Sequence, residues 1–113
     1  MAASIDPLFG PVIVVGLGGI MVELLKDTAI DLAPVAPWQA RAMLERLKGS
    51  ALLRGFRGSE PVDIDALADI VSRLSEFIAD QREHVAELDV NPLICSGGKI
   101  VAVDALIVKI KQV

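Results

Sequence analysis

Glu87-Leu-Asp-Val-Asn-Pro-Leu-Ile-Cys-Ser-Gly-Gly-Lys-Ile-Val-Ala-Val-Asp104 is the stretch of sequence that decides the fold of this chain. Two β-branched, apolar runs flank a pair of glycines. This pattern predicts a β-hairpin, because the favoured hairpin turns need residues with positive φ. If Gly97 and Gly98 are the central turn residues, paired positions have numbers that sum to 195. Asn91 and Asp104 meet this condition, so the two residues are predicted to lie opposite each other.

The predicted pairing brings oxygen ligands together on one face of the hairpin. Directly opposite residues have Cβ atoms roughly 4.5–5.5 Å apart. Glu87 and Asp89 occupy the alternate positions of the same face. Carboxamide and carboxylate oxygens suit a hard cation such as Mg²⁺, which also takes waters and substrate phosphates. Asn91 and Asp104 are therefore candidate magnesium ligands. The alternative is a polar sheet face, and a three-residue turn would break the pairing.

Composition bounds the other possibilities. The chain has 113 residues, of which 53% are hydrophobic, 23% charged and 4% aromatic, so one domain with an aliphatic core is expected. The net charge of −4, without a cluster of basic residues, argues against nucleic acid. No apolar run reaches the roughly 18 residues of a membrane span. The single cysteine, Cys95, fits a reducing compartment, and a cytoplasmic location is expected.

Strand-like runs dominate the first third of the chain. Residues 1–5 are predicted to be a linker or cloning remnant, followed by a turn-rich entry segment and one folded unit over 6–113. Glycines 16, 18 and 19 would permit close approach to a ligand. Lys26-Asp27 is interpreted as a hairpin turn. The three predicted strands are Val12–Val15, Ile20–Leu25 and Thr28–Leu32.

Two helices are expected in the middle of the chain. Pro37 is well suited to a first helical turn. The spacing of a buried face is given by Trp38, Ala42, one or both of Met43 and Leu44, and Leu47. Gly49 is predicted to end this helix.

The second helix is predicted to begin after Asp63, a suitable N-cap, and to run to about Gln81. Between the helices, Arg54 and Arg57 flank Gly55. Two guanidinium groups beside flexible backbone can bind a phosphate or a carboxylate. The alternative is that these loop arginines pair with local acids.

The order of elements indicates an α+β domain, with an antiparallel or mixed sheet of about five strands and two helices packed on one face. The terminal hairpin, however, is apolar on both faces, with Leu93, Ile100 and Ala102 assigned to the face that holds the acids. Antiparallel sheets with one wet face usually alternate more cleanly. Another part of a larger protein is therefore expected to cover this second face. Without it, a weak homodimer is expected.

Four stretches together resemble the ATP-grasp subunit of NDP-forming acyl-CoA synthetases, the relatives of succinyl-CoA synthetase. These stretches are Asp6-Pro-Leu-Phe-Gly-Pro-Val12, Gly16-Leu-Gly-Gly-Ile-Met-Val-Glu-Leu-Leu-Lys-Asp27, Leu53-Arg-Gly-Phe-Arg-Gly58 and Glu87-Leu-Asp-Val-Asn-Pro-Leu93. They cover nearly the whole chain from Asp6 and occur in the family's order. Such enzymes make an acyl-CoA from an acid, CoA and a nucleoside triphosphate, through acyl-phosphate and phosphohistidine intermediates.

The resemblance implies roles for matching residues. Asn91 and Asp104 correspond to the magnesium ligands. Asp89 corresponds to an acid that faces the phosphohistidine, although some relatives have Glu there. The remaining assignments are to phosphate contacts by Arg54 and Arg57, and to the nucleotide cleft by Gly18, Gly19 and Glu23.

The resemblance also implies what the chain lacks. An ATP-grasp site lies between two α+β lobes, and this chain resembles the C-terminal lobe alone. The expected partners are a nucleotide (ATP or GTP), Mg²⁺, the N-terminal ATP-grasp lobe, and domains of a parent protein that bind CoA. The isolated chain is expected to be inactive. The alternative is a non-catalytic, regulatory ATP-grasp-like module of a protein acetyltransferase fusion.

Overall fold

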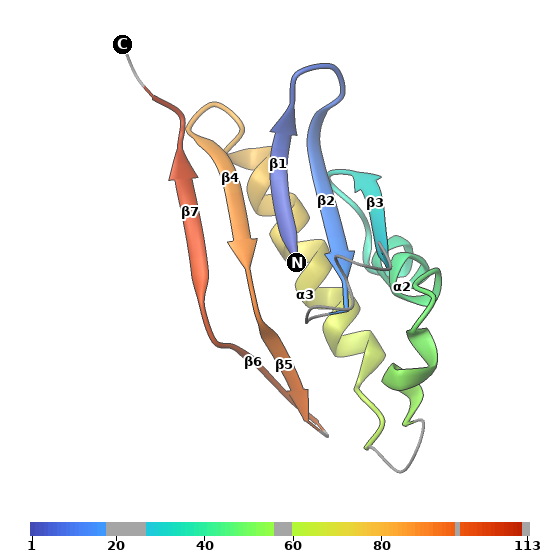
Figure 1. Cartoon of the computed structure of the whole chain (residues 1–113). Helices are drawn as coiled ribbons and strands as arrows, with labels where there is room; N and C mark the ends of the chain where they lie inside the picture. The colour runs from blue at the N-terminus through green and yellow to red at the C-terminus, as the bar shows by residue number, and fades with distance from the viewer. Residues whose placement is uncertain (18–26, 56–59, 97, 112–113) are drawn as a thin grey trace.

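The computed structural model describes residues 1–17, 27–55, 60–96 and 98–111. An antiparallel five-stranded sheet has the order β3-β2-β1-β4-β7, and β5 and β6 form a separate two-stranded ladder (Figure 1). The predicted α+β class is confirmed. The elements are β1 Ala2–Asp6, β2 Gly10–Gly16, β3 Thr28–Leu32, α2 Pro37–Glu45, the 3₁₀ helix η1 Ser50–Arg54, α3 Ile64–Asp80, β4 Val85–Val90, β5 Leu93–Ser96, β6 Lys99–Ala102 and β7 Ala105–Lys109.

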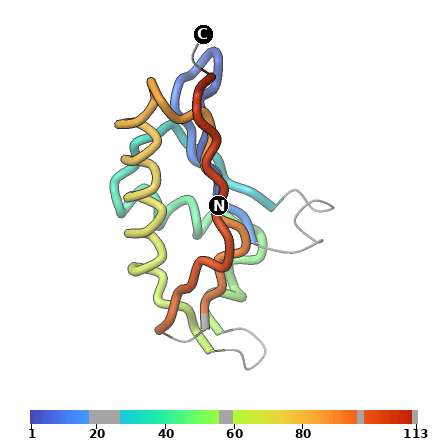
Figure 2. Tube along the Cα trace, turned by 90° about the vertical axis from the view of Figure 1, so that its left-hand side faces the viewer, coloured from blue at the N-terminus to red at the C-terminus, as the bar shows by residue number. Residues whose placement is uncertain are grey.

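The helices cover one face of the sheet. Helix α3 packs on β1, β2 and β4, while α2 packs on α3 and on the β2–β3 side. Figure 2 shows α3 running alongside the strands, on one side of them. Ile13, Val15, Ala3 and Leu88 point into this layer and are buried, as alternation along a strand requires. Strand β7 lies at the edge of the sheet, beside β4 and away from α3 (Figure 1).

The prediction of a linker at residues 1–5 was wrong. Ala2–Asp6 forms β1, which pairs with β2 on one side and with β4 on the other. The Ala-Ala-Ser-Ile sequence carries little apolar periodicity of its own, so its strand conformation comes from these two neighbours. The segment predicted as a turn-rich entry is the turn between β1 and β2. There Asp6 Oδ1 accepts hydrogen bonds from the backbone amides of Leu8 at 2.8 Å and Phe9 at 3.0 Å.

The predicted hairpin register is confirmed. In the β5–β6 ladder Leu93 pairs with Ala102 and Cys95 with Ile100, and each pair of numbers sums to 195. The same register continues in the β4–β7 pairing as far as Glu87 and Val108, beyond which a bulge shifts it. One hairpin therefore contributes both the fourth strand of the sheet and the sheet's edge.

The predicted faces of this hairpin were wrong beyond Pro92. In β4 the even-numbered Leu88 and Val90 point into the core, but in β5 the odd-numbered Leu93 and Cys95 pack against it. Proline has no N–H to donate to a ladder, and the strand breaks there between β4 and β5. The break lets β5 present the opposite set of side chains to the core. Leu93 and Ile100 therefore do not lie on the face that holds the acids.

Helix α2 begins at Pro37, as predicted, and the Ala36 amide donates to Gln39 Oε1 at 2.7 Å. The predicted inward positions of Trp38 and Ala42 were wrong, because Trp38 is 71% exposed and Ala42 is exposed as well. The buried positions are Ala40, Met43 and Leu44.

Gly49 plays a different part from the predicted helix stop. The helix ends at Glu45, and Gly49 precedes η1 with a φ of −88°. A Cβ at this position would overlap Leu17 Cδ1 and lie 3.3 Å from Asp27 Oδ2. The glycine therefore permits close packing of the chain.

Helix α3 begins after Asp63, whose Oδ1 accepts from the Ala66 amide at 3.0 Å, so the predicted N-cap is confirmed. Its buried stripe also contains two serines that the apolar pattern does not indicate. The Ser72 hydroxyl donates to the Val35 carbonyl at 2.7 Å, and Ser75 Oγ accepts from the Val35 amide at 2.9 Å. These bonds attach the loop before α2 to α3. Within the described ranges, no helix is long and apolar enough to cross a membrane.

Candidate functional site

The face of the sheet opposite the helices, here called the open face, carries acids at its centre. Along one row of paired residues Ala2 lies next to Asp89, and Asp89 lies next to Leu106. In a neighbouring row Ser4 lies next to Glu87. Both acidic side chains are exposed in this chain. Burial lowers the pKa of the Met1 ammonium group, and the negative charge of Asp89 partly offsets this effect by raising it.

Apolar side chains lie on both sides of these acids. Val14 pairs with Ile30 on the β3 side, while Leu106 belongs to β7 on the other side. Ile30 and Leu106 are each 61% exposed. The open face is thus an acidic strip between two apolar edges.

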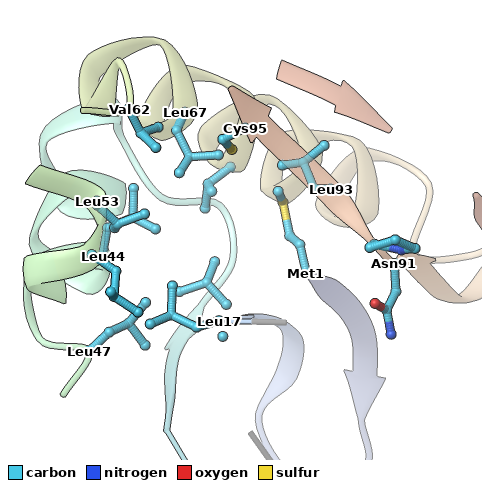
Figure 3. Close-up of a pocket in the computed structure, with 15 residues that line it drawn as sticks. Met1, Leu17, Leu44, Leu47, Leu53, Val62, Leu67, Asn91, Leu93 and Cys95 are labelled. Carbon is cyan, nitrogen blue, oxygen red and sulfur yellow. The ribbon is translucent and has the colours of Figure 1, made fainter. Parts of the chain in front are cut away.

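Asn91 and Asp104 lie opposite each other where the sheet passes into the β5–β6 ladder. The Asn91 amide donates to the Asp104 carbonyl at 3.1 Å. Both side chains are exposed. Asp104 Oδ1 accepts from the Ala105 amide at 2.9 Å, which orients this carboxylate. The Asn91 carboxamide points away from the neighbouring apolar side chains (Figure 3). The structure therefore brings these two predicted site residues together.

The donor set suits a cation that keeps other ligands. Among the described residues, no three His, Cys, Asp or Glu side chains form a group that could hold a metal by themselves. One carboxylate and one carboxamide are a fitting pair for Mg²⁺, which is typically bound through one or two carboxylates plus waters and substrate phosphates. The pair does not fit a structural zinc site, which needs four nitrogen or sulfur ligands.

The remaining predicted residues divide into two groups. Arg54 ends η1 and its side chain is exposed, and Gly55 follows with a φ of +88°. Leu53, directly before Arg54, lines the same pocket as Asn91. The other predicted site residues, Gly18, Gly19, Glu23 and Arg57, lie outside the described residues. The predicted strand at 20–25 lies outside them too.

Asp27 is a buried acid, although its place in the sequence predicts an exposed turn. Its side chain is 8% exposed, and it accepts from the Lys48 amide at 2.6 Å and from the Gly49 amide at 2.9 Å. Asp27 thus joins the segment before β3 to the turn after α2, whereas a surface hairpin turn was predicted. The sequence signal for this role was a carboxylate placed between two apolar runs. A carboxylate in a buried position needs hydrogen-bond donors around it.

A partly open, mostly apolar pocket of about 280 Å³ lies on the helix side of the sheet, close to Asn91 (Figure 3). Leu44 and Leu47 form one wall, Leu53 another, and Leu93 and Cys95 of β5 a third. Burial raises the pKa of the Cys95 thiol above its ordinary value. Cys95 therefore has the character of a small hydrophobic residue rather than of a reactive thiolate.

Comparison with known proteins identifies the fold. The profile of a family described as an ATP-grasp domain matches residues 1–108. Over 100 residues the chain is 42% identical to the beta subunit of an ADP-forming acetate–CoA ligase of Pyrococcus furiosus, covering 88% of this chain and 43% of that subunit. Over 94 residues it is 44% identical to an ADP-forming 4-hydroxybutyrate–CoA ligase of Nitrosopumilus maritimus, covering 83% of this chain and 13% of that protein. The chain thus spans less than half the length of these relatives.

Solved structures lead to the same family as the sequence comparisons. An acetyl-coenzyme A synthetase of Ca. Korarchaeum cryptofilum, in complex with coenzyme A and Mg-AMPPCP, superposes with a TM-score of 0.87 at 42% identity. The match covers 96% of this chain and 50% of that one. From the profile match and the shared fold we conclude that the chain belongs to the ATP-grasp domain family and is similar to part of the ADP-forming acetyl-CoA synthetases.

Proposed function

We propose that this chain forms one wall of the nucleotide-phosphate site of an ADP-forming acyl-CoA synthetase. The observation that carries the proposal is the opposed pair Asn91 and Asp104, exposed at the end of the open face. A phosphate chain held against this face would meet a carboxamide and an oriented carboxylate. An ATP-grasp domain of this kind would work as the C-terminal lobe of a two-lobed site.

Asn91 and Asp104 would hold Mg²⁺ together with waters and phosphate oxygens. The hydrogen bond from the Ala105 amide to Asp104 Oδ1 orients the carboxylate before any ligand arrives, which lowers the cost of binding. When bound, the metal would neutralise charge on the phosphates during phosphoryl transfer. The ladder between the two residues keeps the ligand spacing constant.

The other assignments follow the family's pattern. Asp89 lies two residues before Asn91 on the same face, and we assign it to the position facing a phosphohistidine. Arg54 and Arg57 would neutralise and position the phosphates, since phosphoryl transfer depends on positioning and charge stabilisation. We assign Gly18, Gly19 and Glu23 to the nucleotide cleft.

The partners in this proposal are an N-terminal ATP-grasp lobe and domains that bind CoA. The Korarchaeum synthetase was solved with both coenzyme A and a magnesium nucleotide. The apolar edges of the open face support a covering lobe, because large exposed apolar patches mark interaction sites. The nucleotide is ATP or GTP.

Mutations in the complete synthetase test this proposal. Asn91→Ala and Asp104→Ala are each expected to lower phosphoryl transfer to ADP by about 10²–10³-fold. Two ligands of one ion act as a unit, so the double variant should be scarcely slower than either single variant. Asp69→Ala is the matched control, because Asp69 is an exposed acid on α3. Its rate should be unchanged.

Circular dichroism would check that each variant keeps its fold. The magnesium concentration for half-maximal rate should rise in the single variants and not in the control. Wild-type rates in either single variant at limiting magnesium would overturn the assignment of Asn91 and Asp104.

A further inference from the structure

The proposed magnesium pair lies at the junction between the two ladders of the terminal hairpin. Asn91 falls between β4 and β5, and Asp104 falls between β6 and β7 on the returning chain. The Asn91 amide donates to the Asp104 carbonyl at 3.1 Å. Next to it, the Val103 amide donates to the Pro92 carbonyl at 3.0 Å. These bonds fix the spacing of the two backbones, whereas the direction of the Asn91 carboxamide depends on how the strand is rotated about its axis.

The strand rotates about its own axis as it passes through this junction. Side chains alternate along a regular strand, so in an unbroken strand Leu93 would share a face with Asn91. Instead Asn91 is exposed, whereas Leu93 is half-buried against the core and the following Ile94 is 51% exposed. Figure 3 shows the side chains of Asn91 and Leu93 pointing in different directions from the same ribbon. The direction of the carboxamide is therefore coupled to the rotation of β5.

Side chains, rather than backbone pairing, attach β5 to the rest of the domain. Strands β5 and β6 form a ladder separate from the five-stranded sheet, and a two-stranded ribbon alone is only marginally stable. Within the described ranges, the residues of this ladder that pack against the core are Leu93, Cys95 and Ile100. Leu93 is the nearest of them to Asn91 along the chain, and it lines the same pocket as Leu67 (Figure 3). Leu93 is thus the contact best placed to hold the rotation at the junction.

We propose that Leu93 is a positioning residue for the magnesium pair, an inference that rests on the proposed function. Packing of its side chain on the helix side sets the rotation of β5. That rotation aims the Asn91 carboxamide toward the side of the hairpin where it can share an ion with Asp104. Mg²⁺ demands near-ideal octahedral geometry, so its ligands must be held closely in place. Leu93 does not contact the ion itself and acts through Asn91.

Leu93→Ala and Ile94→Ala make a matched pair in the complete synthetase. The two substitutions remove apolar atoms from adjacent residues, one packed on the core and the other exposed. Leu93→Ala is expected to raise the magnesium concentration for half-maximal rate about 10-fold, as the loss of groups that support metal ligands does. The rate at saturating magnesium should stay close to wild type, because excess metal refills the site. Ile94→Ala should change neither quantity. An unshifted magnesium dependence in Leu93→Ala, or equal shifts in both variants, would overturn the proposal.

A variant from another part of the core separates positioning from stability. Leu74 is half-buried on α3, lies beside Ile13 and Leu88 of the sheet, and does not line the pocket that contains Leu93. Leu74→Ala should lower the melting temperature, as Leu93→Ala does, yet leave the magnesium dependence unchanged. Leu93→Met keeps most of the apolar volume and should restore the wild-type dependence. If Leu74→Ala shifted the magnesium dependence as much as Leu93→Ala, the effect would be one of stability, and the positioning role would be wrong.

Binding of Mn²⁺ gives a readout that does not depend on catalysis. Mn²⁺ takes the same oxygen ligands as Mg²⁺, and it broadens the NMR signals of nearby protons. The carboxamide signals of Asn91 in the 113-residue chain therefore report a metal held there. Half-maximal broadening should need about 10-fold more Mn²⁺ in Leu93→Ala than in the wild type or in Ile94→Ala.

This titration distinguishes failure of the positioning role from failure of the metal pair. Equal broadening in Leu93→Ala and the wild type would overturn the role of Leu93 alone. Broadening at Asn91 that persists in Asp104→Ala, or that is absent from the wild type, would overturn the magnesium pair and this inference together.

Discussion

The backbone amide of Asn91 donates a hydrogen bond to the carbonyl of Asp104 at 3.1 Å, so these two residues, thirteen apart in the sequence, lie opposite each other in one hairpin. Their side chains are both exposed, and Asp104 Oδ1 also accepts from the Ala105 amide. The spacing of the proposed magnesium ligands is thus set by the backbone of the hairpin. Movement of a helix would leave it unchanged.

The isolated chain is expected to bind Mg-ATP only weakly, with a dissociation constant of about 1 mM or higher. Asn91, Asp104 and Asp89 are all exposed on one wall, and one wall cannot bury a nucleotide. Titration calorimetry with ATP and magnesium would measure the affinity. Micromolar binding by this chain alone would contradict the two-lobed arrangement.

Asp27→Ala should lower the free energy of unfolding by about 2–4 kcal/mol, because it leaves two partly buried amides without their acceptor. These are the amides of Lys48 and Gly49. Urea denaturation followed by circular dichroism measures the change.

Asp31→Ala is the control for this substitution. Asp31 is about half exposed and pairs with Arg46 at 3.7 Å, so its loss should cost less than about 1 kcal/mol. Equal losses in Asp27→Ala and Asp31→Ala would show that the Asp27 hydrogen bonds contribute little.

The Cys95 thiol should react slowly with iodoacetamide at neutral pH. Burial disfavours the thiolate and raises the pKa, so the thiolate fraction at a given pH is lower than for a free cysteine. The rate of alkylation of the folded chain should therefore rise at higher pH than the rate for the same chain unfolded in urea. Coincident pH profiles would mean that the thiol is solvated in the folded chain.

The isolated chain should form a weak dimer through β7. Leu106, Ile107 and Val108 are all exposed, and β7 pairs with β4 on one side within the described sheet. Exposed apolar edge strands tend to pair with another chain. Added salt should favour association, because it screens the repulsion between the acidic open faces of two chains. Sedimentation over a concentration series measures the dimer.

Ile107→Lys should shift the dimer toward monomer, since a charged residue on an edge opposes pairing. Leu8→Lys is the control. Leu8 is 86% exposed, but it lies in the turn between β1 and β2. A chain that stays monomeric at near-millimolar concentration would show that this edge is stable in water.

Local sequence patterns predicted the structure correctly where interactions between residues close in the sequence determine it. The Gly97-Gly98 turn predicted the register of the terminal hairpin, since a turn type dictates the pairing of its two strands. Asp63 and Pro37 marked the starts of the two helices for the same kind of reason, because capping acts within one turn.

The mistakes came from residues whose environment is built by distant segments. Residues 2–6 are a strand because β2 and β4 lie on either side of them. Trp38 has the spacing of a core residue, but α3 and the sheet cover a different side of α2, and Trp38 stays exposed. Ser72 and Ser75 are buried because the Val35 backbone supplies their partners.

The amino-acid sequence by itself determined the class of fold, the hairpin register and thus the pairing of Asn91 with Asp104, because turns, caps and strand alternation act over a few residues. Only the tertiary structure decided which hairpin side chains face the core beyond Pro92, where Asp27 finds its partners, and that a mostly apolar pocket lies beside β5. These features depend on how well surfaces from distant segments fit together. Packing of that kind cannot be predicted from any single stretch of the sequence.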